Sequence, residues 1–73
     1  MKEEYWKTYS KDQAGQIISG LKLLKDRKLL DEKEEGYSDS IIRKLTRIED
    51  WELIPFSQEE YELLENLEYS LWR

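Results

Sequence analysis

The apolar residues of this chain recur every three or four positions in three separate stretches, which is the spacing of one face of an α-helix. The first stretch follows Ser10-Lys11-Asp12-Gln13, a sequence typical of a capping box, in which the serine and glutamine side chains each accept a backbone N–H. We therefore expect the first helix to begin after Ser10. Its apolar positions are Ala14, Ile17, Ile18, Leu21 and Leu24.

The second apolar stretch follows the polar run 31–39, which we interpret as the loop between two helices, with Gly36 ending a turn. Either Ser38 or Asp39 is expected to cap the second helix. This helix should end before Leu53-Ile54-Pro55, because the residue that precedes a proline is pushed out of the helical region. Its apolar positions are Ile41, Ile42, Leu45 and Ile48, with Trp51 as a candidate last member.

The polar run 31–39 also has part of the spacing of an EF-hand calcium loop. Counted from Asp31, Gly36 stands at the sixth position and Asp39 at the ninth. However, Lys33 occupies the third position and Ile42 the twelfth, where the motif needs oxygen ligands. We therefore expect a connecting loop that binds no calcium.

The third stretch opens with a second capping box, Ser57-Gln58-Glu59-Glu60, and Phe56 and Tyr61 are placed to pack on each other as a hydrophobic staple. Its core positions are Leu63, Leu64, Leu67 and Leu71. A second stripe at helical spacing alternates carboxylates and aromatics. Its members are Glu62, Glu65, Tyr69 and Trp72, with Tyr61 and Glu68 beside them.

A shorter aromatic segment, residues 3–9, precedes the first helix. Tyr5, Trp6 and Tyr9 have the spacing of one face of a short helix, although a strand also fits, and they either cover the core or form an exposed contact patch. The sequence contains no internal repeat or linker. The prediction is one acidic helical domain over residues 1–73, an all-α, small three-helix bundle with or without a short extra N-terminal helical segment.

Charge divides the chain into two parts. Residues 1–47 hold nine acidic and eleven basic residues, whereas residues 48–72 hold eight acidic residues and no basic one; the net charge is −5. We expect the basic cluster at 22–28 to be a solvated helix end, and the cluster at 43–47 to pair with the acidic C-terminal segment, either within one chain or between subunits. No direct binding to nucleic acid is expected, because the net negative charge opposes approach to phosphates.

The residues that usually carry catalysis are missing. The chain has neither Cys nor His, so it lacks the ordinary zinc ligands and the usual partners of a nucleophile. Its carboxylates fall on predicted solvent faces, where burial cannot tune their pKa values. We therefore expect no enzymatic activity, no cofactor and no metal site.

The chain is also expected to be a cytoplasmic, soluble homodimer. Its longest apolar run, residues 53–56, is far shorter than a membrane span, and its N-terminus lacks the apolar run of a signal peptide. A domain of 73 residues without disulfides has a thin core, and association is one way to add stability.

An acidic helix can imitate a nucleic-acid backbone, because carboxylates three or four residues apart are spaced about 4.5 to 6 Å along its axis. Aromatic neighbours would add anchors of the kind found at protein interfaces. Alternatively, the stripe is a solvated helix face whose aromatics pack on the N-terminal segment. The predicted partner-binding residues are Glu49, Asp50, Glu52, Glu59, Tyr61, Glu62, Glu65, Glu68, Tyr69 and Trp72.

In size, in the absence of Cys and His, and in the acidic, aromatic segment from Glu49-Asp50-Trp51-Glu52 to Glu65-Asn66-Leu67-Glu68-Tyr69, the chain resembles small bacteriophage proteins that inhibit host machinery by DNA mimicry. Inhibitors of the bacterial sliding clamp belong to this functional group. The resemblance implies a host DNA-binding protein with a basic surface as the partner. The basic N-terminal part departs from a pure mimic. The alternative is a small helical interaction or regulatory module that acts through self-association.

Overall fold

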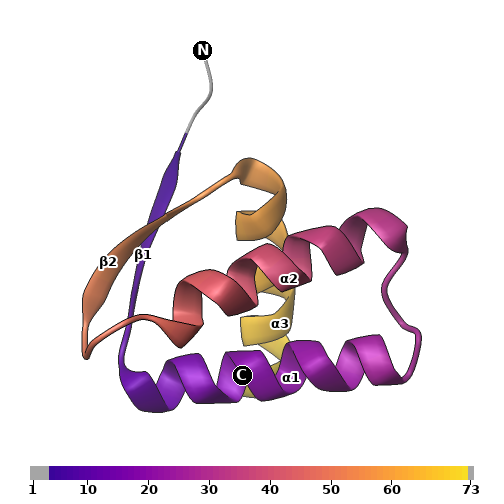
Figure 1. The fold of residues 1–73 in the computed structure, drawn as a ribbon, viewed down its shortest axis with the longest axis horizontal. Coiled ribbons are helices and arrows are strands. Elements are labelled where there is room, and N and C mark those ends of the chain that lie inside the picture. Colours follow the sequence, from indigo (N-terminus) through magenta and orange to yellow (C-terminus); the bar gives the residue numbers. More distant parts are fainter. Residues whose placement is uncertain (1–3, 73) are drawn as a thin grey trace.

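The computed structural model describes residues 4–72 as three helices and a two-stranded antiparallel sheet (Figure 1). The elements, in chain order, are β1 (Tyr5–Tyr9), α1 (Lys11–Asp26), α2 (Glu32–Thr46), β2 (Glu52–Phe56) and α3 (Gln58–Trp72). The N-terminal residues 1–3, including the first residue of the aromatic segment, and residue 73 lie outside the described residues. The predicted all-α bundle is therefore wrong, because the three helices share an α+β fold with a sheet.

The aromatic segment is a strand and not a short helix. Tyr5, Lys7 and Tyr9 alternate with the exposed Trp6 and Thr8, so burial follows the two-residue period of a strand. Aromatic and β-branched residues favour such a half-buried, pleated surface. The sequence did not show this alternation, because the inward position between Tyr5 and Tyr9 holds a lysine instead of an apolar residue. The three aromatics also have the spacing of a helix face.

The strand β2, unlike β1, was not among the alternatives that the sequence analysis left open. It pairs with β1 in the register Tyr5 to Phe56 and Trp6 to Pro55. A proline is tolerated because β2 lies at an edge of this two-stranded sheet, where one row of backbone groups has no strand partner. The carbonyl oxygen of Pro55 instead accepts a hydrogen bond from Lys44 Nζ at 3.1 Å.

Helix α1 begins where the sequence predicted. The Ser10 hydroxyl accepts the Gln13 N–H at 3.1 Å, and the Gln13 side chain accepts the Ser10 N–H at 3.2 Å, which completes the predicted capping box. The helix continues through Gly20 to Asp26. A methyl group on Gly20 would lie 3.0 Å from Leu67 of α3, so this glycine allows the two helices to cross closely.

Helix α2 begins much earlier than predicted, at Glu32. Asp31 is its N-cap, and it exchanges hydrogen bonds with Glu34: the Asp31 carboxylate accepts the Glu34 N–H at 2.8 Å, and the Glu34 carboxylate accepts the Asp31 N–H at 3.0 Å. The predicted loop over 31–39 is therefore wrong, and neither Ser38 nor Asp39 is the cap. Gly36 lies inside the helix.

The end of α2 also differs from the prediction. The helix stops at Thr46, and Ile48 is buried from the following turn rather than from a helical face. Trp51, a candidate last member of the helix face, lies in that turn with a φ of 60°, and its side chain is 65% exposed.

The core lies where the three helices and the inner face of the sheet meet. In Figure 1, α1 and α2 run antiparallel side by side, and α3 crosses behind both. Leu63, Leu64 and Leu67 of α3 are buried as predicted, whereas Leu71 is 41% exposed beyond the crossing. Within residues 4–72, no helix is both long enough and apolar enough to cross a membrane.

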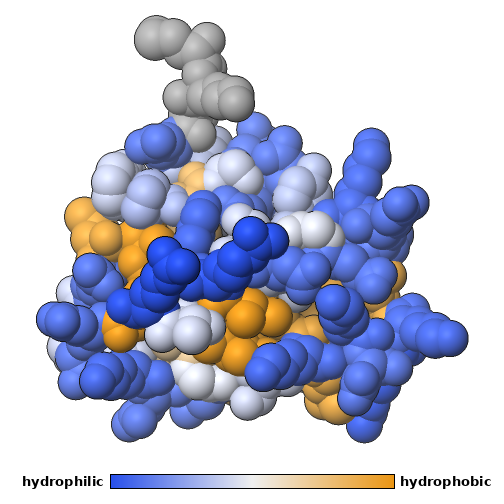
Figure 2. All heavy atoms as spheres, in the orientation of Figure 1, coloured by the Kyte–Doolittle hydropathy of each residue, from blue (hydrophilic) through white to orange (hydrophobic). Residues whose placement is uncertain are grey.

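Figure 2 shows the face formed by α1 and α2, where apolar surface is surrounded by hydrophilic side chains. The seam between the two helices contains a shallow groove of about 280 Å³, whose apolar lining includes Ala14, Ile18 and Ile48. Near the end of α1, Lys25 Nζ pairs with the carboxylate of Asp39, in the middle of α2, at 3.2 Å.

Helix α3 is attached to α2 by a buried ion pair. The side chain of Glu60 is 5% exposed, and its carboxylate accepts hydrogen bonds from Lys44 Nζ at 2.8 Å and from the Ser57 N–H at 2.8 Å. The Glu60 N–H in turn donates to the Ser57 hydroxyl at 3.3 Å, so the second predicted capping box is confirmed. The predicted pairing of the basic cluster at 43–47 with the acidic C-terminal segment is also confirmed for Lys44, within one chain.

This pair makes stability depend on pH. Burial alone would raise the pKa of Glu60, but hydrogen bonds from Lys44, Ser40 and Ser57 outweigh burial and lower the pKa below its ordinary value of 4.5. The contribution of the ionised Glu60 to the free energy of unfolding is therefore present above pH 4.5 and is lost as the pH falls through the lowered pKa. We expect urea titrations to show stability falling below this pH, and Glu60→Gln to reduce that dependence. An equal acid dependence in the variant would contradict the prediction.

Candidate protein-binding surfaces

Two of the carboxylates predicted to imitate phosphates are held by a lysine of β1. Lys7 Nζ lies 2.8 Å from Glu68 Oε2 and 3.1 Å from Glu65 Oε1, and its side chain is only 12% exposed. The hydroxyl of the buried Tyr9 donates a hydrogen bond to the same Glu68 carboxylate. Because Lys7 neutralises one of their two charges and fixes both side chains within the chain, Glu65 and Glu68 are less available to imitate phosphates toward a partner.

These contacts shift the pKa values of Lys7, Glu65 and Tyr9. Burial alone would lower the pKa of Lys7, but its bonds to Glu68 and Glu65 outweigh this effect and raise it, so the ammonium stays charged at neutral pH. The pKa of Glu65 is lowered, first by a hydrogen bond from Tyr61 and then by Lys7. Burial, followed by the bond to Glu68, raises the pKa of Tyr9. The group is therefore a fixed ion-pair network at neutral pH.

The aromatics of the predicted stripe have different surroundings. Tyr61 stacks on Tyr5 of β1 with 4.8 Å between ring centroids, which confirms for this residue the alternative that the aromatics pack on the N-terminal segment. Trp72 donates from its indole N–H to Gln16 of α1 at 2.6 Å and is 39% exposed. Tyr69 is 67% exposed.

Glu59 and Glu62 are the exposed acidic residues at the start of α3. They line a small pocket of about 160 Å³ together with Glu34 and Tyr37 of α2. Gln58 Nε2 lies 3.4 Å from Glu62 Oε1, and within the described chain no lysine or arginine pairs with either carboxylate. The same described residues contain no group of three or more potential ligands that could hold a metal ion. The cluster contributes unpaired negative charge to α3.

A second surface lies on the outer face of the sheet and in the turn before it. Trp6 is 53% exposed, Trp51 65% and Leu53 57%. We call these three residues the sheet patch. Trp6 and Leu53 share the outer face, because their cross-strand neighbours are Pro55 and Thr8, and Trp51 stands two residues before Leu53. Large apolar side chains exposed in the same part of the fold are typical of a binding surface.

Glu49, Asp50 and Glu52 accompany the sheet patch. The Asp50 carboxylate accepts the backbone N–H of Lys11 at 2.8 Å, and the Glu52 carboxylate accepts the backbone N–H of Glu49 at 3.3 Å. These acids stand at the opposite end of β2 from the start of α3 (Figure 1). The ten residues predicted to bind a partner therefore divide between two surfaces.

Trp51 has an unusual backbone. Its φ of 60° lies in the left-handed region, which costs a non-glycine residue roughly 1 to 2 kcal/mol. The conformation is held by a hydrogen bond from the Trp51 N–H to the carbonyl oxygen of Tyr9 at 2.8 Å. Strained residues of this kind concentrate at functional sites, so the strain singles out Trp51 within the sheet patch.

Sequence reasoning missed Lys7 and Leu53 as residues that shape these surfaces, whereas the exposed contact patch left open for the aromatic segment is confirmed for Trp6. The signal for Lys7 was its position midway between Tyr5 and Tyr9, which places it on the inward side if the segment is a strand. Leu53 was placed after the end of the second helix, in the connection that leads to Pro55, so its place on an exposed strand face was not considered.

The chain matches no protein-family model, no curated protein and no solved structure. Its function is therefore inferred from its own surfaces.

Proposed function

We propose that the chain is a non-catalytic binding module that docks the sheet patch on a basic surface of a partner protein that handles nucleic acid. The observation that carries the proposal is the joint exposure of Trp6, Trp51 and Leu53 beside three carboxylates. Tryptophan is among the residues most enriched at interface hot spots, where a few anchors supply most of the binding energy.

Charge supports a basic partner. Glu49, Asp50 and Glu52 flank the anchors, and Glu59 and Glu62 on α3 add further negative charge. Complementary potentials accelerate association and orient the partner, and a protein surface that is basic and accessible commonly binds phosphates. The module would therefore compete with nucleic acid for its partner. The resemblance to phage inhibitors makes the sliding clamp the first candidate to test, in the cytoplasm of a bacterial host.

The stripe of α3 needs a different test from the sheet patch. Reversing the charge of Glu65 or Glu68 would break their bonds with Lys7, so a loss of binding could reflect damage to the fold. Glu62 is exposed and outside that network, and Tyr69 is the most exposed aromatic of the stripe. Neither residue belongs to the ion pairs of Lys7, so both allow α3 to be tested with those ion pairs intact.

The experiment compares two aromatic truncations, Trp51→Ala in the sheet patch and Tyr69→Ala on α3. The tagged protein is used to capture its partner from bacterial lysate, and the dissociation constant for the purified partner is then measured with each variant. We expect Trp51→Ala to weaken binding by at least about tenfold, as for a hot-spot anchor, and Tyr69→Ala to change it by less than about threefold. Duplex DNA should compete with the module, and rising salt should weaken the complex.

The charge variant Glu49→Lys provides a second measurement, because the side chain of Glu49 is exposed and none of the described contacts depends on its carboxylate. It should slow association, and Glu62→Lys is its counterpart on α3. If Tyr69→Ala and Glu62→Lys weaken the complex while Trp51→Ala does not, the docking surface is α3 and the proposal is wrong. A captured partner that duplex DNA fails to displace would contradict the competition with nucleic acid.

A further inference from the structure

The two edges of the small sheet differ in what they offer to a further strand. Backbone groups of an antiparallel strand point alternately toward the paired strand and away from it. Because Pro55 has no N–H, its pair with Trp6 is one in which both backbones point away from each other. On the β2 side, this outward position offers no donor, and its carbonyl oxygen is already bound by Lys44 Nζ at 3.1 Å. The edge of β2 is therefore closed at Pro55.

The outer edge of β1 is open. By the same alternation, Trp6 and Thr8 point their backbone N–H and C=O groups away from β2. Both residues are exposed, and within residues 4–72 no hydrogen bond outside the pairing of β1 with β2 involves their backbones. We call these backbone groups the β1 edge. A free strand edge is a template for pairing with another extended chain.

Negative charge surrounds the β1 edge. Glu4 is exposed immediately before β1, and Glu65 and Glu68 lie around Lys7 on the inner face of the strand. The single positive charge of Lys7 does not balance these three carboxylates. The side chain of Glu65 is 49% exposed, so its carboxylate is accessible from the solvent beside β1. A basic segment is therefore electrostatically complementary to the β1 edge.

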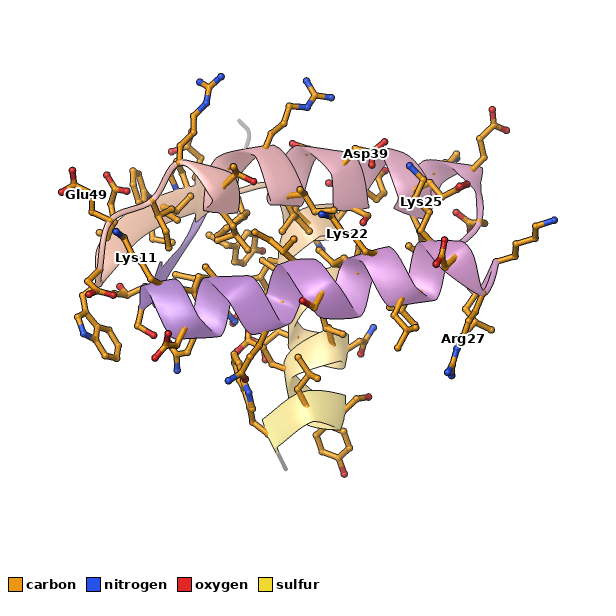
Figure 3. The ribbon with its side chains drawn as sticks, turned by 60° about the horizontal axis from the view of Figure 1, so that its bottom comes forward. Lys11, Lys22, Lys25, Arg27, Asp39 and Glu49 are labelled. Atoms are coloured by element: carbon orange, nitrogen blue, oxygen red, sulfur yellow. The ribbon has the colours of Figure 1, made fainter. Side chains whose placement is uncertain are left out.

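The basic residues of α1 do not offset this charge. In Figure 3, Lys22, Lys25 and Arg27 lie along the second half of α1 and at its end, whereas β1 leads into the start of that helix. Lys11 is at the start, but it is accompanied by Asp50, whose carboxylate accepts the Lys11 N–H at 2.8 Å.

We propose that the partner adds one extended segment, in which basic and apolar residues alternate, to the β1 edge as a third strand. This segment would be part of the basic surface to which the sheet patch docks, so the inference rests on the proposed function. Every second side chain of the added strand would lie on the inner face near Glu65, where a lysine or arginine fits. The intervening side chains would lie on the outer face beside Trp6, where an apolar side chain fits. Main-chain hydrogen bonds to Trp6 and Thr8 would supply affinity, and the alternating side chains would supply specificity.

Charge disfavours a second copy of β1 as the added strand. Two β1 strands joined edge to edge by a two-fold axis would share one inner face. Both sets of Lys7, Glu65 and Glu68 would meet there, and each set carries two carboxylates and one ammonium. Like charges on facing strands oppose pairing, whereas a basic strand is attracted by the same carboxylates.

Amide hydrogen exchange, followed residue by residue by NMR, tests this arrangement on the unchanged protein. The probe is a short synthetic peptide that alternates arginine and valine, and the control peptide alternates glutamate and valine. The arginine peptide should bind at least about tenfold more tightly than the control peptide. It should slow the exchange of the Trp6 and Thr8 N–H groups by at least about tenfold. The exchange of the Lys7 N–H, which faces β2, should stay nearly the same.

Thr8→Pro removes one donor of the β1 edge. The sheet should tolerate this change, because the Thr8 N–H points away from β2. The variant should bind the arginine peptide at least about fivefold more weakly, since one main-chain hydrogen bond is lost. Thr8→Val keeps the N–H and is the matched control, which should bind as the unchanged protein does. Equal weakening by both variants would assign the effect to the side chain and overturn the inference.

Three results of the exchange experiment would also overturn it. They are no binding of the arginine peptide up to millimolar concentration, unchanged exchange of Trp6 and Thr8 when that peptide saturates the protein, and protection of both amides in the free protein that rises with its concentration. The last result would show that a second copy occupies the β1 edge.

The captured partner distinguishes this inference from the proposed function. If Trp51→Ala weakens the complex while the Trp6 and Thr8 amides stay unprotected in it, the sheet patch is a docking surface and the inference about the β1 edge is wrong. If Trp51→Ala leaves the complex intact, the proposed function fails, and protection of the two amides by the arginine peptide still supports the β1 edge as a strand-binding site.

Discussion

Replacing Trp51 by glycine is expected to separate stability from binding. The free energy of unfolding should be unchanged or raised by up to about 1 kcal/mol, because glycine adopts the left-handed backbone without strain. The greater conformational freedom of glycine in the unfolded chain offsets part of that gain. The lost side chain is 65% exposed, so little burial disappears. Binding to the partner should fall by at least about tenfold, because the anchor of the sheet patch is removed.

The measurements are urea unfolding at neutral pH and the dissociation constant for the captured partner. Trp6→Gly is the matched control, because Trp6 belongs to the same sheet patch but lies inside β1, where glycine destabilises a strand by about 0.5 to 1 kcal/mol. Trp6→Gly should therefore lose both stability and binding. If Trp51→Gly is clearly less stable than the unchanged protein, the turn does not strain Trp51; if it binds normally, Trp51 is not the anchor.

The start of a helix could be predicted where a serine is followed three residues later by a glutamate or glutamine, which is the usual sequence of a capping box. Ser10 with Gln13 and Ser57 with Glu60 both formed as expected. Asp31 with Glu34 is the same device with aspartate at the cap, and it was overlooked because the surrounding residues are polar and include Gly36. Helix α2 is amphipathic over its second half, and its first half is helical chiefly through this cap and its tertiary contacts.

The sheet could not be predicted because its pairing joins residues far apart in the chain. Tyr5 meets Phe56 and Tyr9 meets Glu52, and neither segment shows the regular alternation of apolar and polar residues. In β1 the inward lysine breaks the pattern, and in β2 the proline argued for a loop. The five-residue strands are stable only together and against the helices, so local sequence carries little of the information.

The candidate site was predictable in composition but not in arrangement. Counting charges located the acidic, aromatic C-terminal part, yet it could not show that Lys7 from the other end of the chain holds Glu65 and Glu68. Nor could it show that β2 separates the turn before it, which holds Glu49 and Asp50, from the start of α3. A pair of side chains about 60 residues apart is a property of the fold, and the strand that creates it was only one of two alternatives left open for the aromatic segment.

Replacing Lys44 by methionine is expected to have the largest effect on stability, lowering the free energy of unfolding by about 2 kcal/mol. The change leaves the carboxylate of Glu60 buried without its cation, and breaking a fully buried pair costs about 3 to 5 kcal/mol. The smaller value applies because the Lys44 side chain is 35% exposed and water already screens part of the interaction. The Ser57 N–H still donates to Glu60, so α3 should remain capped.

Adding Glu60→Gln to Lys44→Met tests whether the uncompensated charge causes this loss. Glutamine at the same position can still accept the Ser57 N–H as part of the capping box, but it carries no charge into the core. The double variant should therefore be more stable than Lys44→Met alone at neutral pH, and the two should converge as the pH falls and the glutamate becomes protonated. If the double variant is less stable than Lys44→Met at neutral pH, the methylene packing and hydrogen bonds of Lys44, rather than its charge, are what attach α3 to α2.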